Sequence, residues 1–201
     1  DNYFPMGLLY LATIIKNQGI DVKILDINNC FYMKDVDESV LNEYVEGIFS
    51  KFLADYKPDV VGIGCVFSGA FKSLKIIAKK TKEIFPGVPI VIGGIHATIF
   101  AKEILKKYSF IDYIVIGEGE NTFLELVKYL TGSSNRSLSF ADGIALREKN
   151  EIKLIPKMKY ETDLDALPLI DYSLINLNEY KMDTSGWYSP KKLKVGQPFS
   201  I

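Results

Sequence analysis

An apolar run that stops at two glycines constrains this chain more than any other feature. Residues 88–92 are rich in β-branched side chains, and Gly93 and Gly94 follow at once. Such a run predicts a buried strand that turns sharply at its carboxyl end. Because glycine has no side chain, these two residues let the atoms of a ligand come close to the backbone. A helix is expected to begin near Thr98, so that its free N–H groups face the same crevice.

Similar apolar runs alternate with helical patterns through the first 130 residues. Strands are expected over residues 20–27, 59–66, 88–92 and 111–116. Helices are expected over residues 6–18, 38–56, 70–85, 98–108 and 122–130, the last opened by a capping box at Thr122. The run at 59–66 is continuous, which is typical of a strand covered on both faces. This β-α alternation predicts a doubly wound parallel sheet with helices on both faces.

The two ends of the chain depart from this alternation. The sequence opens with a loop and a helix where such folds have a strand, so we expect the first strand to be truncated, disordered or absent. After Thr131 a polar break leads to a predicted hairpin around residues 149–150, and then to an irregular, aromatic-rich tail. We therefore expect a ligand-binding domain over residues 1–135, a hairpin extension over 136–160 and a linker over 161–201.

Composition excludes several classes of partner. Hydrophobic residues make up 48% and charged residues 24%, and the net charge of −1 gives no electrostatic footprint for nucleic acid or an anionic membrane. The longest apolar stretch near the start is too short to span a bilayer, which takes about 20 residues. Cys30 and Cys65 lie too far apart for a metal-ligand spacing, and their free thiols favour a reducing cytoplasm.

Three glycine-containing turns follow apolar strands and carry the candidate binding residues. In open parallel sheets, ligands bind beyond the carboxyl ends of the strands, so these turns are expected to line one crevice. The candidates are Ser68, Gly69, Gly93, Gly94, His96, Ala97, Gly117, Glu118, Gly119 and Glu120. Each also has a simpler interpretation: the glycines serve only the turns, His96 is a polar loop residue, and Glu118 and Glu120 are carboxylates at a helix N-terminus. No phosphate loop, complete dinucleotide fingerprint or nucleophile elbow occurs, so no catalytic residue and no metal ligand is assigned.

At these residues the chain resembles the N-terminal cobalamin (B12)-binding domain of radical S-adenosylmethionine enzymes, the group that includes anaerobic magnesium-protoporphyrin monomethyl ester cyclases. The resemblance covers nearly the whole chain, in order. The matching stretches are residues 5–12 (PMGLLYLA), 57–63 (KPDVVGI), 93–98 (GGIHAT) and 116–123 (IGEGENTF), with 163–168 (DLDALP) similar to the segment that leads to the radical barrel.

The resemblance implies a flavodoxin-like sheet with cobalamin over the strand carboxyl ends. Gly93 and Gly94 would approach the corrin tail, Ser68 and its neighbours would line the nucleotide-loop pocket, and residues 117–120 would border the cleft. The D-x-H-x-x-G motif that supplies an axial histidine in many cobalamin proteins is missing. The C-x-x-x-C-x-x-C motif for a [4Fe–4S] cluster is also missing, and it is expected shortly after Ile201.

The chain alone is therefore expected to be inactive. The [4Fe–4S] cluster and S-adenosylmethionine belong to the parent protein, which is expected to be an oxidoreductase, cyclase or methyltransferase with its barrel beyond Ile201. Two alternatives stay open at this point. One is a degenerate, cofactor-free docking domain of the same fold, and the other is a receiver-like or flavin-binding signalling module, although Gly117 and Glu118 leave no lysine where a receiver needs one.

Overall fold

The computed structural model describes residues 4–27, 38–134, 138, 141–149 and 151–180. Cys30, Asn150 and the tail after residue 180 lie outside the described residues. The chain divides into two compact units, which we call the sheet unit (38–167) and the terminal unit (1–37 with 168–201). In the part that the structure describes, no helix is both long and apolar enough to cross a membrane.

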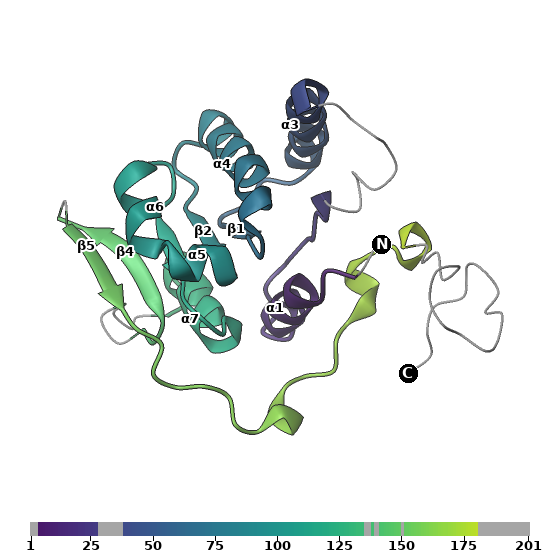
Figure 1. Ribbon diagram of the computed structural model, residues 1–201. Coiled ribbons are helices and arrows are strands. Elements are labelled where there is room, and N and C mark those ends of the chain that lie inside the picture. Colours follow the sequence, from purple (N-terminus) through teal and green to yellow (C-terminus); the bar gives the residue numbers. More distant parts are fainter. Residues whose placement is uncertain (1–3, 28–37, 135–137, 139–140, 150, 181–201) are drawn as a thin grey trace, which may run out of the picture. The chain divides into compact units, whose positions relative to one another are not determined.

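The sheet unit is built on a mixed five-stranded sheet (Figure 1). Its strands are β1 (Val61–Gly64), β2 (Ile90–Gly93), β3 (Tyr113–Val115), β4 (Ile144–Glu148) and β5 (Glu151–Ile155), in the spatial order β1-β2-β3-β4-β5. The pairs β1–β2 and β2–β3 are parallel, whereas β3–β4 and β4–β5 are antiparallel. The predicted parallel sheet and the predicted hairpin are both confirmed, and the hairpin extends the same sheet.

Helices cover both faces of this sheet, as predicted. The helices of the sheet unit are α3 (Glu38–Asp55), α4 (Phe71–Ile84), α5 (Ile95–Ile99), α6 (Ala101–Lys107) and α7 (Glu120–Leu130), and the 3-10 turns η1 (Ser68–Ala70) and η3 (Leu164–Ala166) belong to the same unit. Ile90 and Ile92 of β2 are buried in a cluster that includes Leu105 of α6. Val91, which points the other way because side chains alternate along a strand, is buried with Leu126 of α7.

Two predicted strands differ from the structure. Residues 20–26 form no strand, because a strand requires backbone hydrogen bonds to a neighbour and no such ladder forms there. β1 is shorter than residues 59–66 and lies at the end of the strand order, with Gly62 and Gly64 exposed. The prediction that this run is covered on both faces holds only in part: Ile63 packs against the core cluster on one face, and Gly62 lies against the Phe123 ring of α7 on the other.

Two helix starts also differ. The helix expected from Thr98 begins at Ile95 and is interrupted at Phe100, which separates α5 from α6. The last helix of the sheet unit, α7, begins at Glu120 with Gly119 as its N-cap, so the capping box predicted at Thr122 is wrong. The Thr122 hydroxyl instead donates to the Asp142 carbonyl and lies 3.1 Å from the Lys157 ammonium. Both partners are distant in sequence, so a local pattern cannot predict these contacts.

The terminal unit contains α1 (Met6–Lys16) and the 3-10 turns η4 (Tyr172–Leu174) and η5 (Leu177–Glu179). Its described parts are joined by the Lys16 Nζ atom, which lies 2.6 Å from Asp171 Oδ2, and by the Tyr180 hydroxyl, which donates to Asp26 Oδ2 at 2.9 Å. A hollow of about 390 Å³ lies beside Asp26 and Tyr180, and it includes none of the predicted site residues.

Asp171 makes the terminal unit sensitive to acid. The hydrogen bond from Lys16, followed by those from Ser173, lowers the pKa of Asp171 from 3.8 to about 2. Because the carboxylate is favoured in the folded state, its contribution is present above pH 3.8 and is lost as the pH falls toward 2. We expect Asp171→Asn to lower the melting temperature at pH 6, and the gap to wild type to narrow as the pH falls from 3.8 toward 2 and to close only below that value. Thermal melts followed by tyrosine fluorescence across this range would measure it, and a gap that does not depend on pH would contradict it.

Candidate cofactor site

The carboxyl ends of β1 and β2 are fastened together by their backbones. Gly64 lies opposite Gly93 in the parallel register. Beyond the register, the Cys65 N–H donates to the Gly93 carbonyl at 2.7 Å, and the His96 N–H donates to the Cys65 carbonyl at 3.2 Å. The first two predicted turns are therefore one continuous structure at one edge of the sheet.

The close contact between these two turns requires a glycine at position 94. Its φ of +100° lies in a region that side chains rarely adopt, and a Cβ there would lie 2.6 Å from the Cys65 carbonyl oxygen. A Cβ on Gly93 would meet nothing nearer than Val115 at 3.8 Å. The backbone of Gly94 therefore lies close to the protein's own backbone at Cys65, and the approach of a ligand to Gly93 and Gly94 stays a prediction.

Two N–H groups at the start of α5, those of His96 and Thr98, are not free. The Thr98 N–H donates to the Gly94 carbonyl within α5, and the His96 N–H is bound to Cys65. The Thr98 hydroxyl has a different use, because it accepts a hydrogen bond of 3.0 Å from the Gly117 N–H. This contact ties the third predicted turn to the second.

Large apolar side chains are exposed around the first two turns. We call them the apolar rim: Val66 (50% exposed), Phe67 (75%), Ile95 (63%), Ile99 (64%) and Phe100 (43%). Exposed apolar groups gathered at one place indicate a binding surface more often than an accident of packing. The sequence does not predict this rim, because its residues lie within strand, loop and helix patterns and their exposure depends on the fold.

Polar and small candidates lie within this rim. Ser68 is exposed at the start of η1 and shares a hydrogen bond of 3.0 Å with His96 Nδ1. A Cβ added to Gly69 would meet nothing within 4 Å, so space is open in front of that residue. Ala97 is fully buried in the core, so neither its side chain nor its backbone is exposed to a ligand.

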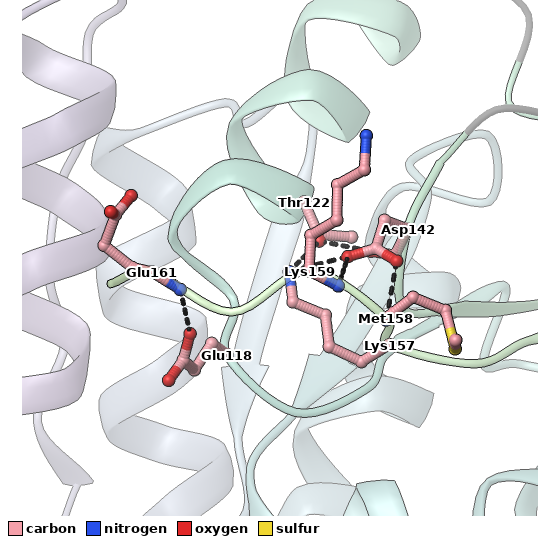
Figure 2. Close-up of polar contacts among 7 residues, drawn as sticks. All are labelled: Glu118, Thr122, Asp142, Lys157, Met158, Lys159 and Glu161. Atoms are coloured by element: carbon pink, nitrogen blue, oxygen red, sulfur yellow. Dashed lines mark hydrogen bonds and ion pairs between the residues drawn. The ribbon is translucent and has the colours of Figure 1, made fainter. Parts of the chain in front are cut away.

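The third turn faces a different part of the chain. Gly117 has a φ of +71° and lies against the Lys157 side chain. Glu118 accepts a hydrogen bond of 3.0 Å from the Glu161 N–H, and Gly119 and Glu120 begin α7. Residues 157–161, which we call the strap, therefore lie over this turn (Figure 2). A hollow of about 170 Å³ remains between them, lined by Glu118, Glu120, Asn121, Lys157, Lys159, Tyr160 and Glu161.

Asp142 holds the strap in place. One carboxylate oxygen accepts from the Met158 N–H at 2.7 Å, and the other accepts from the Lys159 N–H at 3.0 Å (Figure 2). The Lys157 ammonium lies 3.4 Å from Asp142 and 3.1 Å from the Thr122 hydroxyl, and its side chain is only 7% exposed. Sequence patterns gave no signal for this group, because its members come from three separate segments.

The surroundings of Asp142 and Cys65 shift the pKa values of both groups. Partial burial acts to raise the pKa of Asp142, but the N–H donors of Met158 and Lys159 and the Lys157 ammonium outweigh it and lower the pKa overall. Burial raises the pKa of the Cys65 thiol to about 11, so it stays protonated and unreactive at neutral pH.

Comparisons with known proteins agree with this arrangement. The sequence profile of the B12 binding domain matches residues 1–127. An uncharacterized methyltransferase from Pyrococcus horikoshii is 30% identical over 89% of this chain and 36% of its own length. An anaerobic magnesium-protoporphyrin IX monomethyl ester cyclase from Synechocystis is 30% identical over 88% of this chain and 32% of its own length.

A solved structure shares the fold. The radical S-adenosylmethionine methyltransferase TsrM from Kitasatospora setae, determined with cobalamin and a [4Fe–4S] cluster bound, matches with a TM-score of 0.60 at 18% identity. The match covers 82% of this chain and 28% of TsrM. The predicted resemblance is confirmed, and neither the receiver-like nor the cofactor-free alternative is favoured: the chain belongs to the B12-binding domain family.

Proposed function

We propose that this chain binds cobalamin at the carboxyl ends of β1 and β2, as part of a radical S-adenosylmethionine enzyme. The observation that carries the proposal is the apolar rim around the two fastened turns. A cofactor with a broad, largely apolar ring system and polar substituents needs an exposed apolar surface with a few convergent polar groups. The rim and the Ser68–His96 pair meet both requirements.

The residues proposed to hold the cofactor are those of the first two turns. Open space in front of Gly69 leaves room for ligand atoms, and Ser68 and His96 offer hydrogen-bonding groups beside it. The third turn would border the site through Gly117, which Thr98 ties to α5. When bound, the cofactor supplies cobalt-centred methyl-transfer or radical chemistry, while the protein positions it and excludes water.

The remainder of the reaction is assigned to the rest of the protein. The chain spans about a third of the length of the two relatives described above. We propose that a radical S-adenosylmethionine barrel with a [4Fe–4S] cluster follows in the same polypeptide, joined through residues 161–201. The division into a binding domain (1–135) and a hairpin (136–160) remains part of this proposal. A reducing, cytoplasmic compartment suits the buried free thiol of Cys65.

Filling the space at Gly69 is expected to weaken cobalamin binding strongly without unfolding the chain. Gly69→Trp places a large ring where a Cβ meets nothing within 4 Å. We expect at least tenfold weaker binding of hydroxocobalamin, about 1.4 kcal/mol or more, because the ring occupies the volume that the cofactor needs. Titration followed by corrin absorbance, and retention of that absorbance after desalting, would measure the effect.

Gly87→Trp is the matched control. Gly87 also has open space around it, but it precedes β2 and so lies at the opposite edge of the sheet. Binding by this variant should equal that of wild type. Failure of the wild-type chain to retain hydroxocobalamin would refute the proposal and favour a cofactor-free docking domain. Equal loss in both variants would place the cofactor elsewhere.

A further inference from the structure

Ser68 and His96 form a hydrogen-bonded pair that bridges two turns. Ser68 Oγ and His96 Nδ1 lie 3.0 Å apart, although 28 positions separate them in sequence. Ser68 belongs to η1 after β1, and His96 belongs to α5 after β2. The pair exists because the Cys65 backbone fastens these turns together.

The imidazole ring of His96 is held between two aromatic rings. Its centroid lies 4.9 Å from that of Phe71 and 4.8 Å from that of Phe100, at interplanar angles of 48° and 45°. Such contacts restrict the rotation of the ring. With the ring restrained, Nδ1 stays directed at Ser68, while Nε2 has no hydrogen-bond partner among the described residues.

This arrangement is not a nucleophile–base pair of the hydrolase type. A serine nucleophile is activated by a histidine that a third group orients from its other nitrogen. In the part of the chain that the structure describes, no carboxylate fills that place at His96. The pair is therefore suited to binding and orientation.

The protonation of His96 Nδ1 determines whether the Ser68 hydroxyl can donate a hydrogen bond to a ligand. A free serine hydroxyl rotates, and it both donates and accepts. When Nδ1 carries the proton it donates to Ser68 Oγ, so the Ser68 hydroxyl proton is left to donate outward. When Nδ1 is unprotonated it accepts that proton, so only the lone pairs of Oγ remain for a ligand. A ligand acceptor beside Ser68 thus selects the first state.

We propose that His96 is a positioning residue, which orients the Ser68 hydroxyl so that it donates to an acceptor on the nucleotide tail of the bound corrinoid. This inference rests on the proposed function. Apolar side chains surround the pair, and Phe67 and Phe100 would shield the hydrogen bond from water once a ligand covers them. Shielding strengthens such a bond, because the local dielectric constant falls.

Four variants test the inference with two corrinoid probes. His96→Phe keeps an aromatic ring between Phe71 and Phe100 but removes both nitrogens. His96→Asn keeps a hydrogen-bonding atom near the position of Nδ1. Ser68→Ala removes the hydroxyl, and the fourth variant combines Ser68→Ala with His96→Phe. The probes are hydroxocobalamin, which carries the nucleotide tail, and diaquocobinamide, which lacks it. Far-UV circular dichroism and thermal melts identify any variant that fails to fold.

The expected pattern is specific to positioning. His96→Phe and Ser68→Ala should each weaken hydroxocobalamin binding about three- to tenfold, the range of one hydrogen bond. The double variant should be no weaker than Ser68→Ala alone, because the histidine acts through the serine. His96→Asn should recover most of the affinity. None of the four changes should alter the affinity for diaquocobinamide.

Several results would overturn the inference. Additive losses in the double variant, or equal losses with both probes, would show that His96 does not act through Ser68 on the tail. A shift of the corrin absorbance bands in His96→Phe would instead make His96 an axial ligand of cobalt. These results leave the proposed function intact, whereas a wild-type chain that binds neither probe refutes the proposed function itself.

Discussion

We expect Gly94→Ala to lower the free energy of unfolding by about 2–5 kcal/mol, because it combines backbone strain at positive φ with an overpacked contact. The added Cβ would lie 2.6 Å from the Cys65 carbonyl oxygen and 2.8 Å from its carbon, and neither backbone atom can move without disturbing the fastened turns. Urea unfolding followed by circular dichroism measures the change.

Gly93→Ala is the neighbouring control for this prediction. Its Cβ would make ordinary contacts at 3.8 and 3.9 Å with Val115, so we expect a change of no more than about 1 kcal/mol. If both variants were equally stable, the Gly94 backbone would be free to adapt. Its role would then be limited to the approach of a ligand.

We expect Arg147→Met to lower the free energy of unfolding by about 2–3 kcal/mol, because it removes charge-assisted hydrogen bonds and leaves their carbonyl acceptors without a donor. The guanidinium of Arg147 projects from β4 and donates to the carbonyls of Leu105, Tyr108 and Ile111. These carbonyls lie at or just beyond the end of α6, where positive charge is also favoured by the helix dipole.

Two further substitutions serve as controls for the loss of stability in Arg147→Met. Arg147→Lys should recover only part of the loss, because an ammonium cannot reach three carbonyls as the planar fork does. Lys153→Met on β5 removes an exposed ion pair with Glu148, at 3.4 Å, and should cost no more than about 1 kcal/mol. Equal losses in Arg147→Met and Lys153→Met would show that the carbonyls of α6 find other donors.

The order of elements could be predicted from the sequence because each has its own hydrophobic period. The hydrophobic residues of α4 recur with the period of a helix, and those of β2 form the unbroken apolar run of a buried strand. The turn at Gly93 and Gly94 also lies at the predicted position. Residues 20–26 show the limit of this kind of prediction. Their apolar alternation is a local pattern, whereas a strand needs backbone hydrogen bonds to a neighbouring strand. Thr122 shows another, because Asp142 and Lys157 draw its hydroxyl away from capping.

Some features of the candidate site could be predicted from the sequence, and others depend on the fold. Ser68 and His96 were identified singly, from their places after apolar runs, but their pairing depends on the register of β1 and β2. The apolar rim was missed, because exposure is a property of the folded surface. The strap over the third turn was also missed, as it follows from one carboxylate, Asp142, that binds a distant stretch of backbone.

The strap also fixes where the polypeptide leaves the sheet. Two antiparallel reversals return β5 to the direction of β3, so the chain emerges at the edge that carries the glycine turns. Asp142 and Glu118 then hold residues 158–161 there. Whatever follows residue 161 begins its path beside the proposed cofactor, at a departure point that does not depend on how long or how loose the connection is.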